Sequence, residues 1–189
     1  MESPKMSALY GHSSAATPEL ASALALSIAT EINGELAIAI FAMNAQTGID
    51  QATIDLWHGF DDYLIPRILL VTGISDGEPD FDDAVLIARR VLDEVATPFL
   101  VLHDDAGKPA GLISLAENKV IDYSTGEIRN AEAEHVTLVS EFRDEYLAQL
   151  EAAGSEGFES GIFFPAIPIL LPKLGIDIAK SYIERATKR

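Results

Sequence analysis

Short unbroken apolar runs alternate with amphipathic stretches over the first half of this chain. Three runs predict strands, the last two buried on both faces: residues 6–10, 36–43 and 66–71. Three stretches with apolar side chains at helical spacing predict helices: residues 17 to 28–30, 50–63 and 81–95. Strands that alternate with helices predict an α/β fold with a mainly parallel sheet. Trp57 lies on one apolar helical stripe, so we expect it in the core.

The pattern changes after Ala96. Short strands with turn signals between them indicate a small antiparallel unit at residues 99–102, 110–115 and 120–123. A long acidic helix is predicted at 131–153, then a strand at 161–164 and a last helix at 174–187. We therefore expect residues 1–96 and 161–189 to form one α/β core that carries residues 97–160 as a small α+β insertion.

Composition narrows the function classes. The 189 residues suffice for one well-buried domain, and the absence of cysteine excludes disulfides and thiolate metal sites. No apolar run reaches the roughly 20 residues that span a bilayer, and the first five residues lack a signal-peptide pattern, which predicts a cytoplasmic protein without membrane contact. A net charge of −17 disfavours nucleic acid and suits a basic protein partner.

Three groups of reactive residue types do not form a site. His12, Ser13 and Ser14 lack an acid to orient the histidine, so a turn is the better interpretation. The acidic run Asp76, Glu78, Asp80, Asp82 and Asp83 lacks calcium-loop spacing, and Asp80 is expected to cap a helix. The third group, His103-Asp104-Asp105, resembles a solvated turn. We predict no catalytic residue, no metal and no cofactor.

The stretch at residues 8–20 has the outline of a phosphate-binding loop, G-x-x-x-x-G-K-[ST], without the residues that hold phosphate. Gly11 and the neighbouring His12 are present, but Ala16, Thr17 and Pro18 occupy the positions of the second glycine, the lysine and the hydroxyl residue. We expect Thr17 to cap the following helix and Pro18 to be its first residue. Glu19 then places a carboxylate where a phosphate would bind.

In order along the chain, these segments resemble the GTPase domain of elongation factor G with its insertion. Besides Gly11-His12, the similar segments are residues 37–49, 71–75, 80–82, 111–115, 165–166 and 174–177. The resemblance implies a P-loop NTPase-like three-layer fold with a shortened sheet. It covers most of the chain, although no single motif in it is specific.

The departures from that family imply a loss of activity. Thr72, Gly73 and Ser75 occupy the positions of the asparagine, lysine and aspartate that read guanine in N-K-x-D. The few residues between the first helix and Leu36 leave no room for the two strands and two switch regions of the family. The resemblance therefore implies a pseudo-GTPase that is not an enzyme. An alternative is a residual binder of a nucleotide or small ligand near Gly11, Gly73 and Ala166.

Loss of those two strands predicts that residues 6–10 form an edge of the sheet. An exposed edge pairs with a partner's strand or with a second copy of the chain, which makes Met6, Ala8 and Tyr10 a candidate surface. Pro4 and Lys5 would protect it in part. The alternative is an edge covered by a loop of the same chain.

The acidic helix at 131–153 is a second candidate surface. Glu141, Asp144 and Glu145 stand beside an apolar stripe. In elongation factor G the helix of the insertion contacts the basic C-terminal domain of the ribosomal stalk protein, so the resemblance implies a docking surface here. The alternative is an ordinary solvated face. The expected function is that of a protein-interaction module, associated with translation or part of a larger assembly.

Overall fold

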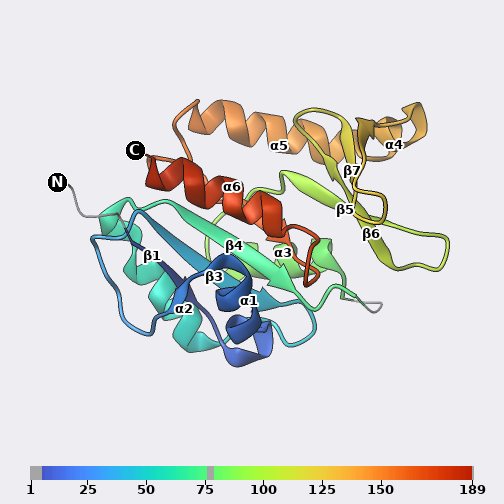
Figure 1. Cartoon of the computed structure of the whole chain (residues 1–189). Coiled ribbons are helices and arrows are strands. Elements are labelled where there is room, and N and C mark those ends of the chain that lie inside the picture. Colours follow the sequence, from blue (N-terminus) through green and yellow to red (C-terminus); the bar gives the residue numbers. More distant parts are fainter. Residues whose placement is uncertain (1–5, 76–78, 189) are drawn as a thin grey trace.

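The computed structural model describes residues 6–75 and 79–188. Its main sheet has five parallel strands in the order β2-β1-β3-β4-β9 (Figure 1). The strands are β1 (Ser7–Tyr10), β2 (Ser27–Ile28), β3 (Ile38–Asn44), β4 (Arg67–Thr72) and β9 (Ala166–Pro168). The predicted α/β fold with a mainly parallel sheet is confirmed.

Helices cover both faces of this sheet. Helices α1 (Thr17–Leu24) and α6 (Ile176–Thr187) lie together on one face, where α6 contacts β3 and β4. Helices α2 (Gln51–Gly59) and α3 (Phe81–Val91) lie on the other face. Two short 3-10 turns are η1 (Ser13–Ala15), between β1 and α1, and η2 (Asp61–Tyr63), after α2.

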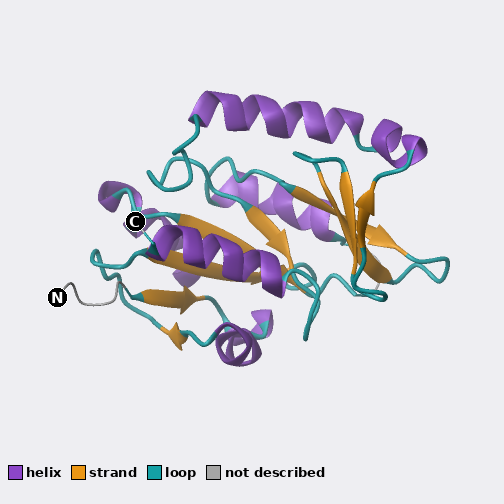
Figure 2. Cartoon of the chain, turned by 45° about the horizontal axis from the view of Figure 1, so that its top comes forward, coloured by secondary structure: helices purple, strands orange, loops and turns teal. Residues whose placement is uncertain are grey.

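A second, antiparallel sheet stands beside the first, with the order β5-β6-β7-β8 (Figure 2). Its strands are β5 (Phe99–His103), β6 (Pro109–Ser114), β7 (Lys119–Asp122) and β8 (Ile128–Asn130). The predicted acidic helix is two helices, α4 (Ala133–Leu138) and α5 (Ser140–Ala153), which meet at Val139. The antiparallel unit is confirmed, while the exact domain boundaries stay a prediction.

The core forms where apolar strands meet an aromatic cluster. Every residue of β4 is buried, as is β3 up to Met43, which is the pattern expected of strands covered on both faces. Phe41 of β3 stacks on Tyr10 with ring centroids 5.1 Å apart and meets Trp57 edge-on at 4.9 Å. Trp57 is fully buried, as its place on the helical stripe predicts.

The prediction that β1 is a sheet edge is wrong. Helix α1 ends at Leu24, earlier than predicted, because Ala25 turns left-handed at φ 54°. The chain then runs back along β1, pairing Ala8 with Ser27 and Leu9 with Ile28. Of the proposed edge surface only Met6 is exposed, whereas Ala8 and Tyr10 are buried. A segment of the same chain therefore covers this strand.

Two further predictions are corrected. Thr17 does not cap α1: it is the first helical residue and is buried, and the cap position belongs to Ala16, which has no capping side chain. The strand predicted at residues 161–164 is displaced to Ala166–Pro168. Gly161 is left-handed at φ 69° and packs against the Leu64 backbone, so the chain turns there and straightens only later.

Asp80 caps α3 as predicted, because its Oδ1 accepts a hydrogen bond from the Asp83 amide. Asp76 and Glu78 of the same acidic run, and Pro4 and Lys5 near the start, lie outside the described residues. Among the helices of the described segments, none is both long enough and apolar enough to span a bilayer.

Candidate functional site

The residues of the degenerate phosphate and guanine motifs lie together at the carboxyl ends of β1 and β4, on either side of β3. This is the edge of a parallel sheet where ligands bind in open α/β folds. Gly11 follows β1, and a side chain there would lie 2.7 Å from the Ala42 carbonyl oxygen of β3. The tight approach of these two backbones is reason enough for a glycine at this position.

Asn44, at the end of β3, joins the two sides. Its Nδ2 donates to the Ser14 carbonyl oxygen at 2.7 Å, and its Oδ1 accepts from the Gln46 amide at 2.8 Å. A side chain at Gly73, the sequence position of the lysine in N-K-x-D, would collide with the Asn44 amide group. Asn44 therefore occupies the space that such a side chain would need. The Thr72 hydroxyl is not available to a ligand either, because it is buried and donates to the Met43 carbonyl oxygen.

Gln46 and Thr47 extend the network on both sides. The Gln46 side chain donates to the carbonyl oxygens of Gly73 and Pro79 at 3.0 and 2.9 Å. Thr47 donates to the Ser14 hydroxyl at 3.2 Å. Uncharged side chains of the chain itself thus link the loops at the carboxyl ends of β1, β3 and β4. We call this set of contacts the loop network: Ser14, Asn44, Gln46 and Thr47.

The start of α1 lacks the features of an anion site. Ala16 is left-handed at φ 56°, Pro18 has no amide hydrogen to donate, and Glu19 adds a negative charge. A shallow hollow beside this helix is lined by Pro18, Glu19, Ser22, Ala23, Leu171 and Pro172. Ala166, which we expected beside Gly11 and Gly73 at a residual ligand site, is fully buried in β9.

His12 and Ser14 are close enough to interact, with 2.9 Å between Nδ1 and the hydroxyl oxygen. The same Nδ1 also accepts from the Ser14 amide. Within the described segments, no carboxylate contacts His12 to orient it for proton transfer. The pair therefore caps the 3-10 turn η1, in agreement with the turn interpretation.

A second candidate site is a groove between α3 and α5, which we call the α3–α5 groove. It is a cavity of about 160 Å³. Its lining residues come from both helices and the loop before β5: Asp82, Val85, Leu86, Arg89, Thr97, Phe142, Glu145, Tyr146 and Gln149. Leu86 and Phe142 are exposed at its rim, 53% and 43% respectively, so large apolar side chains face solvent there.

Two acceptor groups in this groove have no partner within the described parts of the chain. Among the described residues, Asp82 forms no hydrogen bond or ion pair. Burial, together with the charges of Asp80 and Asp83, raises the pKa of Asp82 to about 6. The buried side-chain oxygen of Gln149 likewise has no donor within the part of the chain described. Both groups would gain from a cationic or N–H donor.

The three acidic residues predicted on the helix surface differ in availability. All lie on α5 and are exposed. Glu145 is already paired within the chain, accepting from Arg89 Nη1 at 2.6 Å across the groove. Glu141 and Asp144 have no such ion pair among the described residues. Sequence reasoning missed Asp82, Arg89 and Gln149, since only the tertiary pairing of α3 with α5 brings them together.

Comparison with known proteins relates this chain to elongation factor G. It is 27% identical over 144 residues to elongation factor G of Granulibacter bethesdensis, an alignment that covers 69% of this chain and 21% of that protein. The chain thus spans about a fifth of that relative's length. No model of a known protein family matches the sequence.

The fold is also found among solved structures. A crystal structure of a Thermus thermophilus protein superposes with a TM-score of 0.65 at 23% identity, covering 82% of this chain and 28% of that one. At this identity the likeness shows the fold, an α/β sheet with an insertion, and nothing of the activity.

Proposed function

We propose that this chain is a catalytically inactive, cytoplasmic relative of the elongation factor G GTPase domain that works as a protein-interaction module. The main observation behind the proposal is that the loop network and the α3–α5 groove differ in whether their polar groups are hydrogen-bonded. The loop network satisfies its own hydrogen bonds where a nucleotide would bind, while the α3–α5 groove holds two acceptors without donors among the described residues.

The chemistry of phosphoryl transfer supports the proposed absence of catalysis. That reaction needs a cation on the phosphates, metal ligands and a residue that orients water. Thr17 occupies the position of the lysine cation, Pro18 occupies that of the hydroxyl that ligates the metal, and Glu19 adds repulsion. Asn44 fills the space above Gly73. The segment between α1 and β3 has the two-residue strand β2 as its one regular element, which supports the proposed loss of the switch regions.

The partner we propose is a basic protein, and first among candidates the C-terminal domain of the ribosomal stalk protein. A lysine or arginine entering the α3–α5 groove would meet the Asp82 carboxylate and the Gln149 oxygen. Leu86 and Phe142 would pack against the apolar stem of that lysine or arginine, or against a neighbouring apolar side chain of the partner. Glu141 and Asp144 would steer approach through their charge.

Calorimetry with the purified stalk C-terminal domain tests this. We expect saturable binding to the wild-type chain and at least a tenfold loss for the double variant Glu141→Lys, Asp144→Lys, which leaves the Arg89–Glu145 pair intact. The matched control, Glu127→Lys with Glu151→Lys, has the same change in net charge at exposed positions that are not adjacent in sequence to a lining residue, whereas Glu141 and Asp144 adjoin Phe142 and Glu145. Equal weakening by both pairs would mean that net charge alone drives binding and would reject the groove.

The alternative function, a residual nucleotide or small-ligand binder, is tested on the same protein. GDP with Mg²⁺ at 100-fold excess over its Kd would stabilise the fold by about 2.7 kcal/mol. We expect no rise in melting temperature with GDP and Mg²⁺. A rise of several degrees would reverse the assignment.

A further inference from the structure

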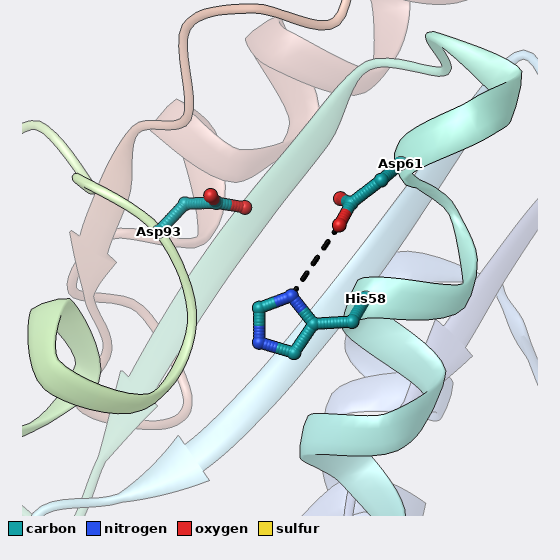
Figure 3. A group of neighbouring side chains, drawn as sticks. All are labelled: His58, Asp61 and Asp93. Carbon is teal, nitrogen blue, oxygen red and sulfur yellow. Dashed lines mark hydrogen bonds and ion pairs between the residues drawn. The ribbon is translucent and has the colours of Figure 1, made fainter.

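A cluster that plays no part in the proposed docking lies where α2 ends. His58 is near the C-terminus of α2, Asp61 begins η2, and Asp93 lies in the loop after α3 (Figure 3). One nitrogen or oxygen atom from each residue lies within 4.8 Å of the other two. The three side chains are 43%, 49% and 37% exposed, so an ion in solution can reach them.

Each of the three side chains is oriented by a partner outside the cluster. The His58 Nε2 donates to the Val91 carbonyl oxygen at 2.9 Å. Asp61 Oδ1 accepts from Arg67 at 2.7 Å. Asp93 Oδ2 accepts from the Trp57 indole at 2.7 Å. Metal ligands in proteins are typically held in this way, with the second atom of each group fixed by a neighbour.

This arrangement leaves His58 Nδ1 and Asp61 Oδ2 for a ligand, and a carboxylate oxygen of Asp93 lies within 4.8 Å of the ligand atoms of the other two residues. A carbonyl oxygen only accepts, so Nε2 of His58 carries a hydrogen and Nδ1 of the neutral ring presents a lone pair. In Figure 3 that Nδ1 faces Asp61, and the Asp93 carboxylate points into the same space. The three residues come from three separate elements, so an ion between them would tie α2, η2 and the loop after α3 together.

The spacing of the first pair suits a shared ion better than a direct bond. His58 Nδ1 and Asp61 Oδ2 are 3.4 Å apart, long for a charge-assisted hydrogen bond of about 2.7–2.9 Å. Two ligands of a tetrahedral zinc ion, with bonds of about 2.0–2.1 Å, lie about 3.3 Å from each other. Asp93 needs to approach by only about 1–1.5 Å from the largest separation, a small change for an exposed side chain.

We propose that His58, Asp61 and Asp93 form a binding site for a divalent transition-metal ion, Zn²⁺ in the first place, with water at the fourth position. One imidazole nitrogen with two carboxylates favours Zn²⁺ over Mg²⁺ or Ca²⁺, which take oxygen ligands. The site departs from the sequence-based prediction of no metal and is independent of the proposed partner.

Arg67 is the charge that opposes an ion at this place. Its guanidinium is buried between Trp57 and Phe164, at 4.8 and 4.4 Å from the ring centroids. The Arg67 guanidinium donates to Asp61 Oδ1 and to the Trp57 carbonyl oxygen. These acceptors partly compensate its positive charge. The two carboxylates still outnumber this one cation, which leaves the cluster with a net negative charge when His58 is neutral.

Calorimetric titration of the full chain with ZnCl₂, after dialysis against EDTA, tests the proposal. We expect one Zn²⁺ per chain, a higher melting temperature with Zn²⁺, and visible absorption bands of tetrahedral Co²⁺ when CoCl₂ is used instead. His58→Ala should weaken Zn²⁺ binding at least tenfold. Asp93→Asn should weaken it similarly while keeping an oxygen that accepts from Trp57. His12→Ala, the matched control at another exposed histidine, should bind like the wild type.

Equal Zn²⁺ affinity in the wild type and in His58→Ala would overturn the proposal. So would equal competition by MgCl₂, since it would indicate only the attraction of cations to an acidic protein. Circular dichroism without metal checks the fold of each variant. Where His58→Ala is unfolded, Asp93→Asn decides, and a folded Asp93→Asn with unchanged Zn²⁺ affinity rejects the site.

Discussion

Two polar regions of this molecule differ in whether their hydrogen bonds are complete. In the loop network, Asn44 uses its amide as donor and acceptor, and Gln46 and Thr47 add bonds on either side. In the α3–α5 groove, Asp82 and the Gln149 oxygen have no donor among the described residues. A polar group that is paired within the chain gains little free energy from binding a ligand. An unpaired polar group near the surface gains a hydrogen bond that it lacked.

The two regions also differ in their position in the fold. The loop network lies where related α/β proteins bind their ligands, yet no cation of the chain contacts it among the described residues. The groove lies between α3, which covers the main sheet, and α5, which follows the second sheet along the chain. It therefore exists only because the insertion is present. Position in the fold alone indicates the loop network as the candidate binding site. The unpaired polar atoms indicate the α3–α5 groove instead.

Breaking the loop network should have the largest effect. Asn44→Ala removes one donor and one acceptor and leaves the Ser14 carbonyl and the Gln46 amide without their partner. We expect a loss of about 2 kcal/mol in the free energy of unfolding, measured by urea denaturation. The control Asn33→Ala, which removes a single exposed bond to the Glu35 amide, should cost about 0.5 kcal/mol.

The Asn44→Ala variant also sharpens the comparison with nucleotide sites. If the network merely blocked an intact pocket, removing its central side chain would restore binding of GDP and Mg²⁺. We expect none, since Glu19 and Pro18 remain. A thermal shift with GDP in this variant would show that the pocket survives beneath the network.

The groove should respond in the opposite direction. Because the pKa of Asp82 is raised from 3.8 to about 6, its ionised form costs the folded state stability. The cost is absent below the unfolded pKa, grows as pH rises from 3.8 to about 6, and is complete above that. Asp82→Asn should therefore stabilise the chain by about 1 kcal/mol at about pH 7.5, with allowance for solvent screening at the exposed side of Asp82.

Urea denaturation of wild type and Asp82→Asn at several pH values measures this. The two stabilities should converge as pH falls to 3.8 and below, since the wild-type carboxyl is then increasingly protonated in both states. The exposed control Asp83→Asn removes a neighbouring charge, and we expect it to stabilise less. A pH-independent gap between Asp82→Asn and wild type would contradict the assigned cause.

The smallest effect is expected at the start of α1. Ala16 adopts φ 56° and ψ 38°, a left-handed conformation that costs an L-residue about 1 kcal/mol and glycine nothing. Ala16→Gly should raise the free energy of unfolding by about 0.5 kcal/mol once the greater backbone entropy of unfolded glycine is subtracted. Ala21→Gly, inside the same helix, should lower it by about 1 kcal/mol. A loss of stability in Ala16→Gly would indicate that the turn differs from this geometry.

The sequence predicts those features that depend on near neighbours. The double-sided burial of β3 and β4, the burial of Trp57 and the cap at Asp80 each follow from spacing or from a side chain three residues away. The short α1 and the strand β2 could not be predicted in this way, because nothing in the sequence marks Ala25 as left-handed.

The candidate sites follow the same rule. Gly11, Gly73 and the other motif residues were found because a linear pattern relates them. Asn44 and Asp82 were not recognised as site residues, because their importance depends on contacts with distant segments: Asn44 reaches Ser14 on another loop, and Asp82 lines the same groove as Gln149 of another helix. The cluster of His58, Asp61 and Asp93 likewise needs the end of α2 to meet the loop after α3.

The pairing of β4 with β9 has a consequence for biosynthesis. These strands are neighbours in space, yet the described helices α3, α4 and α5 and the second sheet separate them along the chain. While the ribosome is still making that intervening segment, the largely apolar strand β4 has an open side to which another nascent chain can attach. Only the late emergence of Ala166–Pro168 closes this side, so the insertion determines how long an unfinished copy needs shielding by chaperones.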